Sequence, residues 1–125
     1  MRRIYESDIV YYRGFNPGDT RRIKTGDSGW DSYLFVTDTI KGAGWYGSQI
    51  EKIVLKPTTR IAKEGTSAFR KLAVGLKRNI SMLEWAATIA ERAKAEGYDA
   101  VHFERQTDIG TPIMNLDSIQ SRELL

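Results

Sequence analysis

The chain has 125 residues, with 19 basic and 16 acidic side chains, one histidine and no cysteine. This length corresponds to a single domain spanning residues 1–125, and a composition of 41% hydrophobic and 28% charged residues is that of a globular protein rather than a disordered one. The lack of cysteine excludes disulfides, a thiolate nucleophile and the common structural zinc sites, and the single histidine argues against a multi-histidine metal site or a Ser-His-Asp triad.

The first part of the chain alternates between β-forming segments and turn residues. A strand is predicted over residues 9–12, with Arg13 directly after it, and residues 16–19 (NPGD) predict a turn. The glycine-containing stretch 20–31 is expected to be a long loop. A second strand follows at residues 32–37, and its nearly continuous apolar character predicts a central position in a sheet.

A short helix and two further strands are expected next. Asp38 or Thr39 can cap the helix, and three glycines within residues 42–47 keep it short. The alternating segment 49–56 predicts a half-buried strand, and another strand is expected at residues 59–62.

The strongest helix signal in the chain lies at residues 81–96. Ser81 and Glu84 form a capping box, and Gly97 is a stop signal. A weaker helix is predicted at residues 67–77. The residues of the stronger helix that share one apolar face at helical spacing are Met82, Trp85, Ala86, Ile89 and Ala93.

Two strands close the predicted fold. Residues 100–103 and 111–116 are expected to pair as a hairpin across the loop 104–110. His102 alternates with apolar neighbours, so its side chain points to the opposite face, where we expect it to be packed or solvent-facing. Strand-rich segments on both sides of a helical one predict an α+β fold.

The charge pattern and the apolar runs say little about partners. The longest apolar runs are far below the roughly 18 residues of a membrane span, and no apolar segment follows the basic N-terminus, so we expect no signal peptide, no membrane partner and a cytoplasmic protein. We interpret the basic residues as solvated surface, with a phosphate-facing patch for nucleic acid as the alternative. The basic residues that cluster are Arg2, Arg3, Arg21, Arg22 and Lys24.

The chain lacks several common motifs of nucleotide and hydrolytic sites. A P-loop, an HExxH and a GxSxG are all missing from the sequence. Polar residues at the ends of predicted strands and in the following loops are therefore the candidates, since these positions present site residues on a rigid scaffold. They are Arg13, Thr37, Tyr46 and Asp108.

The order and spacing of several segments resemble the ADP-ribosyltransferase fold. Tyr12-Arg13-Gly14 stands where diphtheria-toxin-like and poly(ADP-ribose)-polymerase-like members end an early strand in His-Gly. Phe35 and Tyr46 hold the places of two tyrosines with ten residues between them, and Ala43 stands three residues before the second. The resemblance implies a split antiparallel or mixed sheet with a few flanking helices.

The end of the chain extends this resemblance. Residues 97–101 and 113–117 are similar to the closing strands of small bacterial and phage members, so that the likeness covers roughly residues 9–55 and 97–119. The acid in Asp108-Ile109-Gly110-Thr111 is similar in position to one in phage-encoded ADP-ribosyltransferases that block bacterial CRISPR immunity.

Three departures from the family pattern stand out. Arg13 replaces the first histidine, as in the arginine-type branch of toxins, and Phe35 lacks the hydroxyl of the first tyrosine. Thr111 and Pro112 stand where a glutamate precedes the last strand, so the nearest acids are Asp108 and then Glu104.

The resemblance implies an NAD-dependent mono-ADP-ribosyltransferase, a toxin-like effector of bacterial or phage type. Asp108 or Glu104 would stabilise the positive charge that develops on the ribose when nicotinamide leaves. Arg13 would pair with a pyrophosphate or ribose oxygen, and Gly14 would allow the carboxamide close approach to the backbone. The other expected cofactor contacts are stacking of the Phe35 and Tyr46 rings on the nicotinamide. Thr37 would form a hydrogen bond with the ribose or hold the catalytic acid in place.

The expected partners follow from the same resemblance, with alternatives open. Besides NAD, the expected acceptor is a protein, with nucleic acid second because of the basic residues near Arg21. The missing glutamate supports an alternative of a different class, a catalytically degenerate module that binds a partner protein or nucleic acid. A member that resembles tRNA 2′-phosphotransferases would need more basic residues around the pocket than the sequence has.

Overall fold

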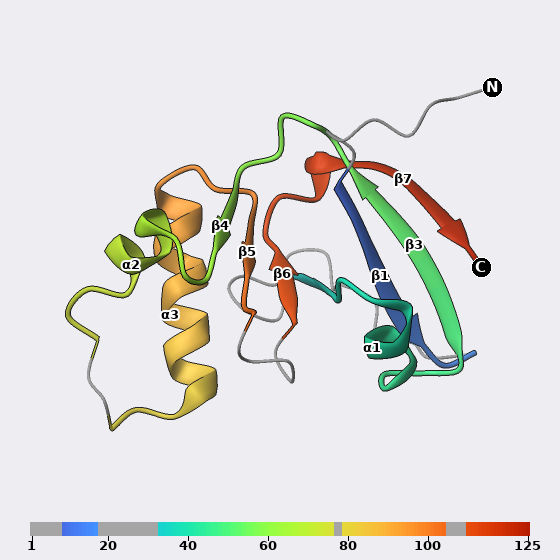
Figure 1. Ribbon diagram of the computed structural model, residues 1–125, viewed down its shortest axis with the longest axis horizontal. Helices are drawn as coiled ribbons and strands as arrows, with labels where there is room; N and C mark the ends of the chain where they lie inside the picture. Colours follow the sequence, from blue (N-terminus) through green and yellow to red (C-terminus); the bar gives the residue numbers. More distant parts are fainter. Residues whose placement is uncertain (1–8, 18–32, 77–78, 105–109) are drawn as a thin grey trace.

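The strands of the chain divide into two sheets (Figure 1). The computed structural model describes residues 9–17, 33–76, 79–104 and 110–125. The first sheet is antiparallel and contains, in spatial order, β1 (Ile9–Phe15), β3 (Gln49–Leu55) and β7 (Ile119–Leu124). The second contains β2 (Leu34–Val36), β6 (Thr111–Ile113), β5 (Ala100–His102) and β4 (Ile61–Lys63). Only the β4–β5 pair is parallel among the strand pairs of the described residues.

Helices flank the two sheets. They are α1 (Ile40–Gly44), α2 (Ser67–Leu72) and α3 (Met82–Ala95), with a 3-10 turn at Leu116–Ser118 before β7. In Figure 1, α2 and α3 lie on one side of the second sheet, the first sheet lies on the other, and α1 lies at the end of β1 and β3. The layers are therefore, in order, the helices α2 and α3, the second sheet and the first sheet, which is an α+β arrangement. None of the helices in the described ranges has the length and apolar character needed to cross a membrane.

Two apolar clusters correspond to the two spaces between these layers. Against the helices, the second sheet contributes Tyr33, Ala62, Val101, Phe103 and Met114, which pack with Phe69, Leu72, Ala86, Ile89, Ala90 and Ala93. Between the sheets the buried residues are Tyr11, Leu34, Val36, Ile53, Leu55, Ala100 and Ile113. Alternate residues of the second sheet thus serve different cores, which explains why its strands read as nearly continuous apolar runs.

Tyr12 and Thr37 join the two sheets through their backbones. Each donates its N–H to the carbonyl of the other, and both N···O distances are 2.7 Å. Thr37 directly follows β2, so this bridge holds the end of the second sheet against the middle of β1. A split sheet was expected from the resemblance; the structure shows two sheets and a few helices, which confirms the α+β class at that coarser level.

The strongest predicted helix is present with its predicted caps. The Ser81 hydroxyl accepts the N–H of Glu84 at 3.1 Å, and Gly97 follows the helix with φ = +86°. The predicted buried face is wrong at Met82, which is 50% exposed because the first turn of α3 extends past the sheet, and Trp85 is half-buried against Phe69 and Phe103. The buried residues of α3 are Ala86, Ile89, Ala90 and Ala93.

Several predicted elements differ from the observed ones, including the strand predicted over residues 111–116, which ends at Ile113. β1 continues to Phe15, so Arg13 and Gly14 lie inside the strand, paired with Glu51 and Ile50, and not after its end. The helix predicted over residues 67–77 ends at Leu72, and Gly75 has φ = +79°, which an α-helix does not allow. β7 was not predicted, because its side chains are mostly exposed and lack an apolar alternation.

β1 can approach α1 closely only because Gly14 has no side chain. A Cβ built on Gly14 would lie 1.7 Å from the backbone oxygen of Ala43, and one on Gly47 would lie 2.1 Å from the carbonyl carbon of Phe15. The contact atoms belong to the backbone and cannot rotate away. Gly14 therefore fixes the position of α1 on β1, whereas the sequence prediction gave it a role in contacting the cofactor.

We predict that Gly14→Ala lowers the free energy of unfolding by about 3 kcal/mol, the upper end of the usual cost of overpacking. Gly44→Ala is the matched control in α1, because a Cβ there meets nothing within 4 Å, and it should change stability by no more than about 1 kcal/mol. Urea unfolding of both variants measures the difference. Equal unfolding midpoints for the two variants would contradict the packing role of Gly14.

Candidate functional site

A hollow of about 100 Å³ lies at the edge of the second sheet where three strand ends meet. Because β6 is antiparallel to both β2 and β5, the end of β2, the start of β6 and the end of β5 share this edge. The edge is also where the Tyr12–Thr37 bridge joins the sheets. The hollow is lined by Thr37, Asp38, Thr39 and Gly42, by His102, Phe103 and Glu104, and by Gly110 and Thr111.

Local backbone structure fixes the side of the hollow that faces α1. Thr39 is the N-cap of α1 and accepts the N–H of Gly42 at 2.9 Å. The Thr37 hydroxyl donates to the Thr39 carbonyl at 2.9 Å, and a Cβ on Gly42 would lie 3.2 Å from that hydroxyl oxygen. Of the two capping residues the sequence allowed, Thr39 is the one used.

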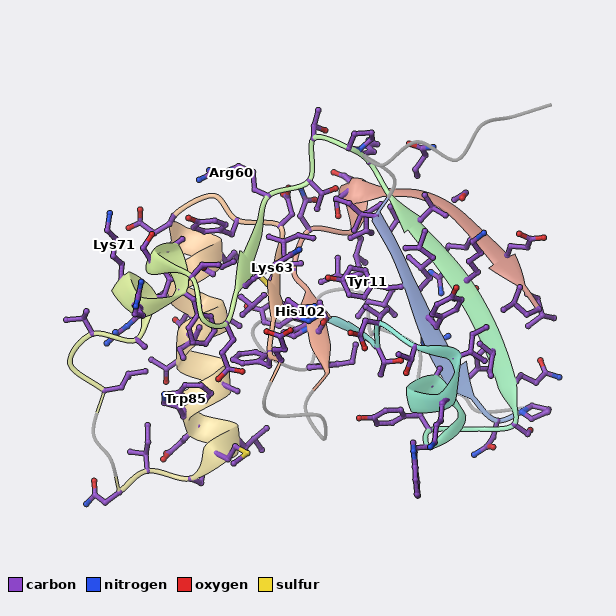
Figure 2. The ribbon with its side chains drawn as sticks, viewed as in Figure 1. Tyr11, Arg60, Lys63, Lys71, Trp85 and His102 are labelled. Carbon is purple, nitrogen blue, oxygen red and sulfur yellow. The ribbon has the colours of Figure 1, made fainter. Side chains whose placement is uncertain are left out.

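A buried hydrogen-bond cluster connects the hollow to the first sheet. The Tyr11 hydroxyl lies 3.0 Å from Nδ1 of His102, and the Thr111 hydroxyl lies 3.3 Å from the same nitrogen. Figure 2 shows Tyr11 and His102 side by side between the sheets. Tyr11 and Thr111 are 4% and 2% exposed, so the cluster is shielded from water, while His102 is half-buried and lines the hollow.

Burial determines the protonation of Tyr11. The pKa of Tyr11 is raised from 10.0 to about 12, mainly because burial desolvates the phenolate; a hydrogen bond with Thr111 lowers the pKa and the carboxylate of Asp38 raises it. The phenol therefore keeps its own proton at neutral pH.

The charges around the hollow are arranged unevenly. Asp38 and Glu104 line it, both in exposed positions, and the described lining includes no lysine or arginine. On β1, Arg13 lies two residues from Tyr11 and so on the same face. The Arg13 guanidinium lies 3.9 Å from a Glu51 carboxylate oxygen and 5.0 Å from the centre of the Phe15 ring.

Glu51 is shared between two arginines. The same carboxylate oxygen accepts from Nε and Nη2 of Arg122 on β7, at 3.1 and 2.7 Å. Two guanidinium groups on one carboxylate leave a net charge of +1 on this face of the first sheet. Two carboxylates thus line the hollow, while the group of Arg13, Glu51 and Arg122 on the first sheet carries a net positive charge.

The structure brings several of the predicted site residues together. Thr37 and Glu104 line the hollow. The carbonyl oxygen of Ala43 contacts Gly14 and accepts the N–H of Tyr46 at 3.0 Å, so the backbones of Gly14 and Tyr46 meet at one atom. Because Gly42 lines the hollow, α1 lies between the hollow and the β1 segment that carries Arg13.

Other predicted site residues are not placed in this region. Phe35 packs against the cluster between the second sheet and the helices, on the opposite face of β2 from Leu34 and Val36. Asp108 lies outside the described residues. So do the basic residues Arg2, Arg3, Arg21, Arg22 and Lys24.

Sequence reasoning did not assign Tyr11, His102 or Thr111 to a site. The expected alternation of His102 against Val101 and Phe103 is confirmed, since these neighbours are buried on the helix side. The same alternation in β1 separates Tyr11 from Tyr12. No local sequence pattern shows that the face of β1 with Tyr11 and the face of β5 with His102 oppose each other across the sheet junction.

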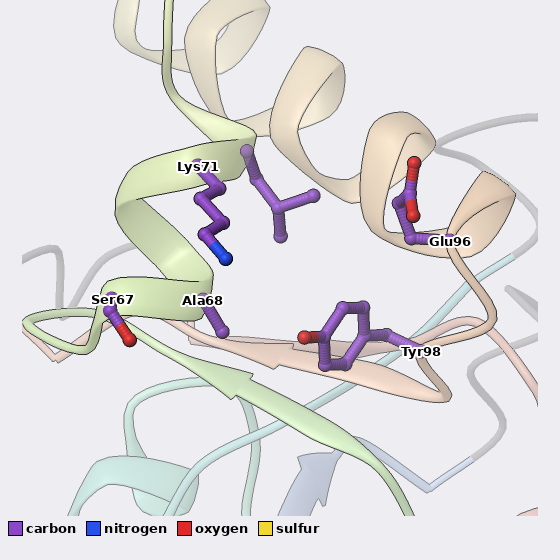
Figure 3. Close-up of a pocket in the computed structure, with 6 residues that line it drawn as sticks. Ser67, Ala68, Lys71, Glu96 and Tyr98 are labelled. Carbon is purple, nitrogen blue, oxygen red and sulfur yellow. The ribbon is translucent and has the colours of Figure 1, made fainter.

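A larger hollow of about 300 Å³ lies elsewhere, between α2 and the end of α3. Figure 3 shows that Lys71 and Tyr98 extend toward this space, with Glu96 at its side. Arg60 covers the Tyr98 ring at 4.6 Å. None of the predicted site residues in the described part of the chain lines this hollow, and it lies away from the sheet junction, so it serves below as a control surface.

Comparison with protein-family models, with curated proteins and with solved structures finds no match for the chain. Within the described ranges, no three aspartate, glutamate or histidine side chains cluster closely enough to hold a metal ion.

The raised pKa of Tyr11 predicts a loss of stability in alkali. Between pH 10 and 12 the unfolded chain releases its phenol proton while the folded chain keeps it, so the free energy of unfolding falls as pH rises. With a folded pKa of about 12 and a reference value of 10.0, the wild type should lose about 2 kcal/mol more than Tyr11→Phe over this interval. Urea unfolding of both proteins at several pH values measures the difference; parallel curves would contradict the burial effect.

Proposed function

We propose that the chain is an NAD-dependent mono-ADP-ribosyltransferase whose cofactor binds across the sheet junction. The nicotinamide riboside half is placed in the hollow lined by Thr37 and Glu104, and the pyrophosphate toward Arg13. At about 100 Å³ the hollow is smaller than the roughly 300–1,000 Å³ of pockets that enclose a whole drug-sized ligand, so it accommodates one part of the dinucleotide.

The proposal is carried by the match between the charges of NAD and those of the side chains near the sheet junction. NAD has a cationic pyridinium ring at one end of its nicotinamide riboside and an anionic pyrophosphate at the other. The hollow is lined by Asp38 and Glu104 and by no described lysine or arginine, whereas Arg13 and Arg122 share a single carboxylate among the described residues. A cation is therefore favoured in the hollow and an anion beside Arg13.

The reaction that this arrangement supports is displacement at the anomeric carbon. The bond between C1′ and the pyridinium nitrogen breaks, and its electron pair stays on nitrogen, so neutral nicotinamide leaves. The acceptor's nucleophile forms a bond to C1′ and gives up its proton. Positive charge spreads over the ribose in the transition state, and a carboxylate near the sugar stabilises it.

Two acids are proposed for this role. Glu104 is the second residue after the end of β5; it is exposed and lines the hollow. Asp108 stands two residues before Gly110, which also lines the hollow, and is the acid that the family resemblance favours. We propose that Tyr46, rather than Phe35, stacks on the nicotinamide ring, since Phe35 packs on the helix side of the second sheet.

The acceptor that we propose is a protein, with nucleic acid second. Trp45, beside Tyr46 at the end of α1, is 83% exposed. Exposed aromatic side chains are enriched where proteins contact partners. A bacterial or phage effector that modifies a host protein is consistent with this surface.

A degenerate binding module is the second candidate, and one observation favours it. Where family members place a glutamate before the closing strand, the chain has Thr111 and Pro112, which are both buried in β6. A module that has lost catalysis would have no reason to keep an NAD site, so NAD binding separates the two candidates.

Calorimetry with NAD tests the cofactor site. Tyr46→Ala and Arg13→Ala should each weaken NAD binding by about 1–2 kcal/mol, through lost stacking and a lost charge-assisted contact. Glu51 keeps its partner Arg122 in the Arg13 variant, so the fold should survive. Lys71→Ala, which removes a cation from the other hollow, should leave NAD affinity unchanged. Weakening by Lys71→Ala alone would move the site to that hollow.

Turnover tests the acid. With labelled NAD and cell lysate as the source of acceptor, Glu104→Gln should lower transfer by about 100-fold or more at nearly unchanged NAD affinity, since the carboxylate acts mainly on the transition state. Asp108→Asn is the paired variant, and a loss confined to it would assign the acid to Asp108. If the wild type neither modifies a macromolecule nor hydrolyses NAD, the binding module is the better description.

A further inference from the structure

Within the described residues, one ring nitrogen of the single histidine has hydrogen-bond partners and the other has none. Nδ1 of His102 lies 3.0 Å from the Tyr11 hydroxyl and 3.3 Å from that of Thr111. Nε2 makes no hydrogen bond to any other residue in the described part of the chain. Every buried side-chain nitrogen and oxygen described has a partner, so Nε2 is not buried, and the hollow that His102 lines is the space open to it.

We propose that Tyr11 fixes the proton of His102 on Nε2, and that this N–H is the hydrogen-bond donor that the hollow offers to an uncharged oxygen of its ligand. In the proposed function, on which the ligand assignment rests, that oxygen is a ribose hydroxyl or the carboxamide oxygen of nicotinamide. Tyr11 acts through His102 and is a positioning residue.

The direction of the hydrogen bond follows from the surroundings of Tyr11. Its phenol is 4% exposed and protonated at neutral pH, so its O–H needs an acceptor. Among the described residues, the acceptor within hydrogen-bond distance of this hydroxyl is Nδ1 of His102, at 3.0 Å. An imidazole that accepts at Nδ1 carries its proton on Nε2 in the neutral form.

The charges of the hollow select the kind of oxygen that this donor meets. Asp38 and Glu104 line the same space, and no described lysine or arginine does. A phosphate oxygen there would meet two carboxylates and only one neutral donor. A hydroxyl or amide oxygen carries no net charge and forms the same hydrogen bond without that repulsion.

The tautomer is measurable without any ligand. Because His102 is the only histidine, nitrogen-15 labelling of histidine gives a single ring in the NMR spectrum. The proposal predicts a ring protonated at Nε2 in the neutral wild type, and a mixture of tautomers in Tyr11→Phe, where no phenol donates to Nδ1. A wild-type ring protonated at Nδ1, or an unchanged tautomer in a folded Tyr11→Phe, would overturn it.

The ligand contact is tested separately with NAD and with nicotinamide. Either should shift the Nε2 resonance of the wild type. His102→Gln, whose amide can donate from near the Nε2 position, should keep NAD affinity within about 3-fold, whereas His102→Asn, whose amide lies near Nδ1, should lose about 10-fold. If neither compound shifts the Nε2 resonance, the donor role is wrong. A shift with nicotinamide but not with NAD would support the donor and contradict the proposed cofactor.

Discussion

The rest of the structure depends on the backbone bridge between Tyr12 and Thr37. Its two 2.7 Å hydrogen bonds contribute only about 1 kcal/mol each, so its importance lies in position. The bridge fixes the middle of β1 beside the end of β2. Tyr11 on one side of Tyr12 then reaches His102 in the second sheet, and Gly14 on the other side lies against Ala43 of α1.

This placement produces the charge separation on which the proposed function rests. Three strand ends of the second sheet deliver Asp38 and Glu104 to a hollow, while the first sheet presents two arginines on one shared carboxylate. α1 lies between these regions, because Gly14 and Gly47 allow it to approach β1 at backbone distance. A dinucleotide with a cationic ring and an anionic pyrophosphate complements both regions at once.

Local sequence signals predicted the elements that local interactions stabilise. Ser81, Glu84 and Gly97 bounded α3 correctly, and the alternation around His102 placed it opposite its neighbours. Local sequence signals did not predict the structure where pairing with a distant segment determines it. β1 continues through Gly14 because β3 pairs with it, and β7 forms on β3 despite its polar side chains. The cluster of Tyr11, His102 and Thr111 arises from three strands, and Phe35 faces the helices, which its apolar strand did not reveal.

Backbone amide NMR during titration with NAD tests the central claim most directly, since each amide reports its own surroundings. The account predicts that the largest shifts occur at Thr37, Thr39, Gly42, Gly110 and Thr111, which line the hollow at the sheet junction. Shifts confined to the segment Ser67–Leu72 and Tyr98, around the other hollow, or no shifts at saturating NAD, would contradict it.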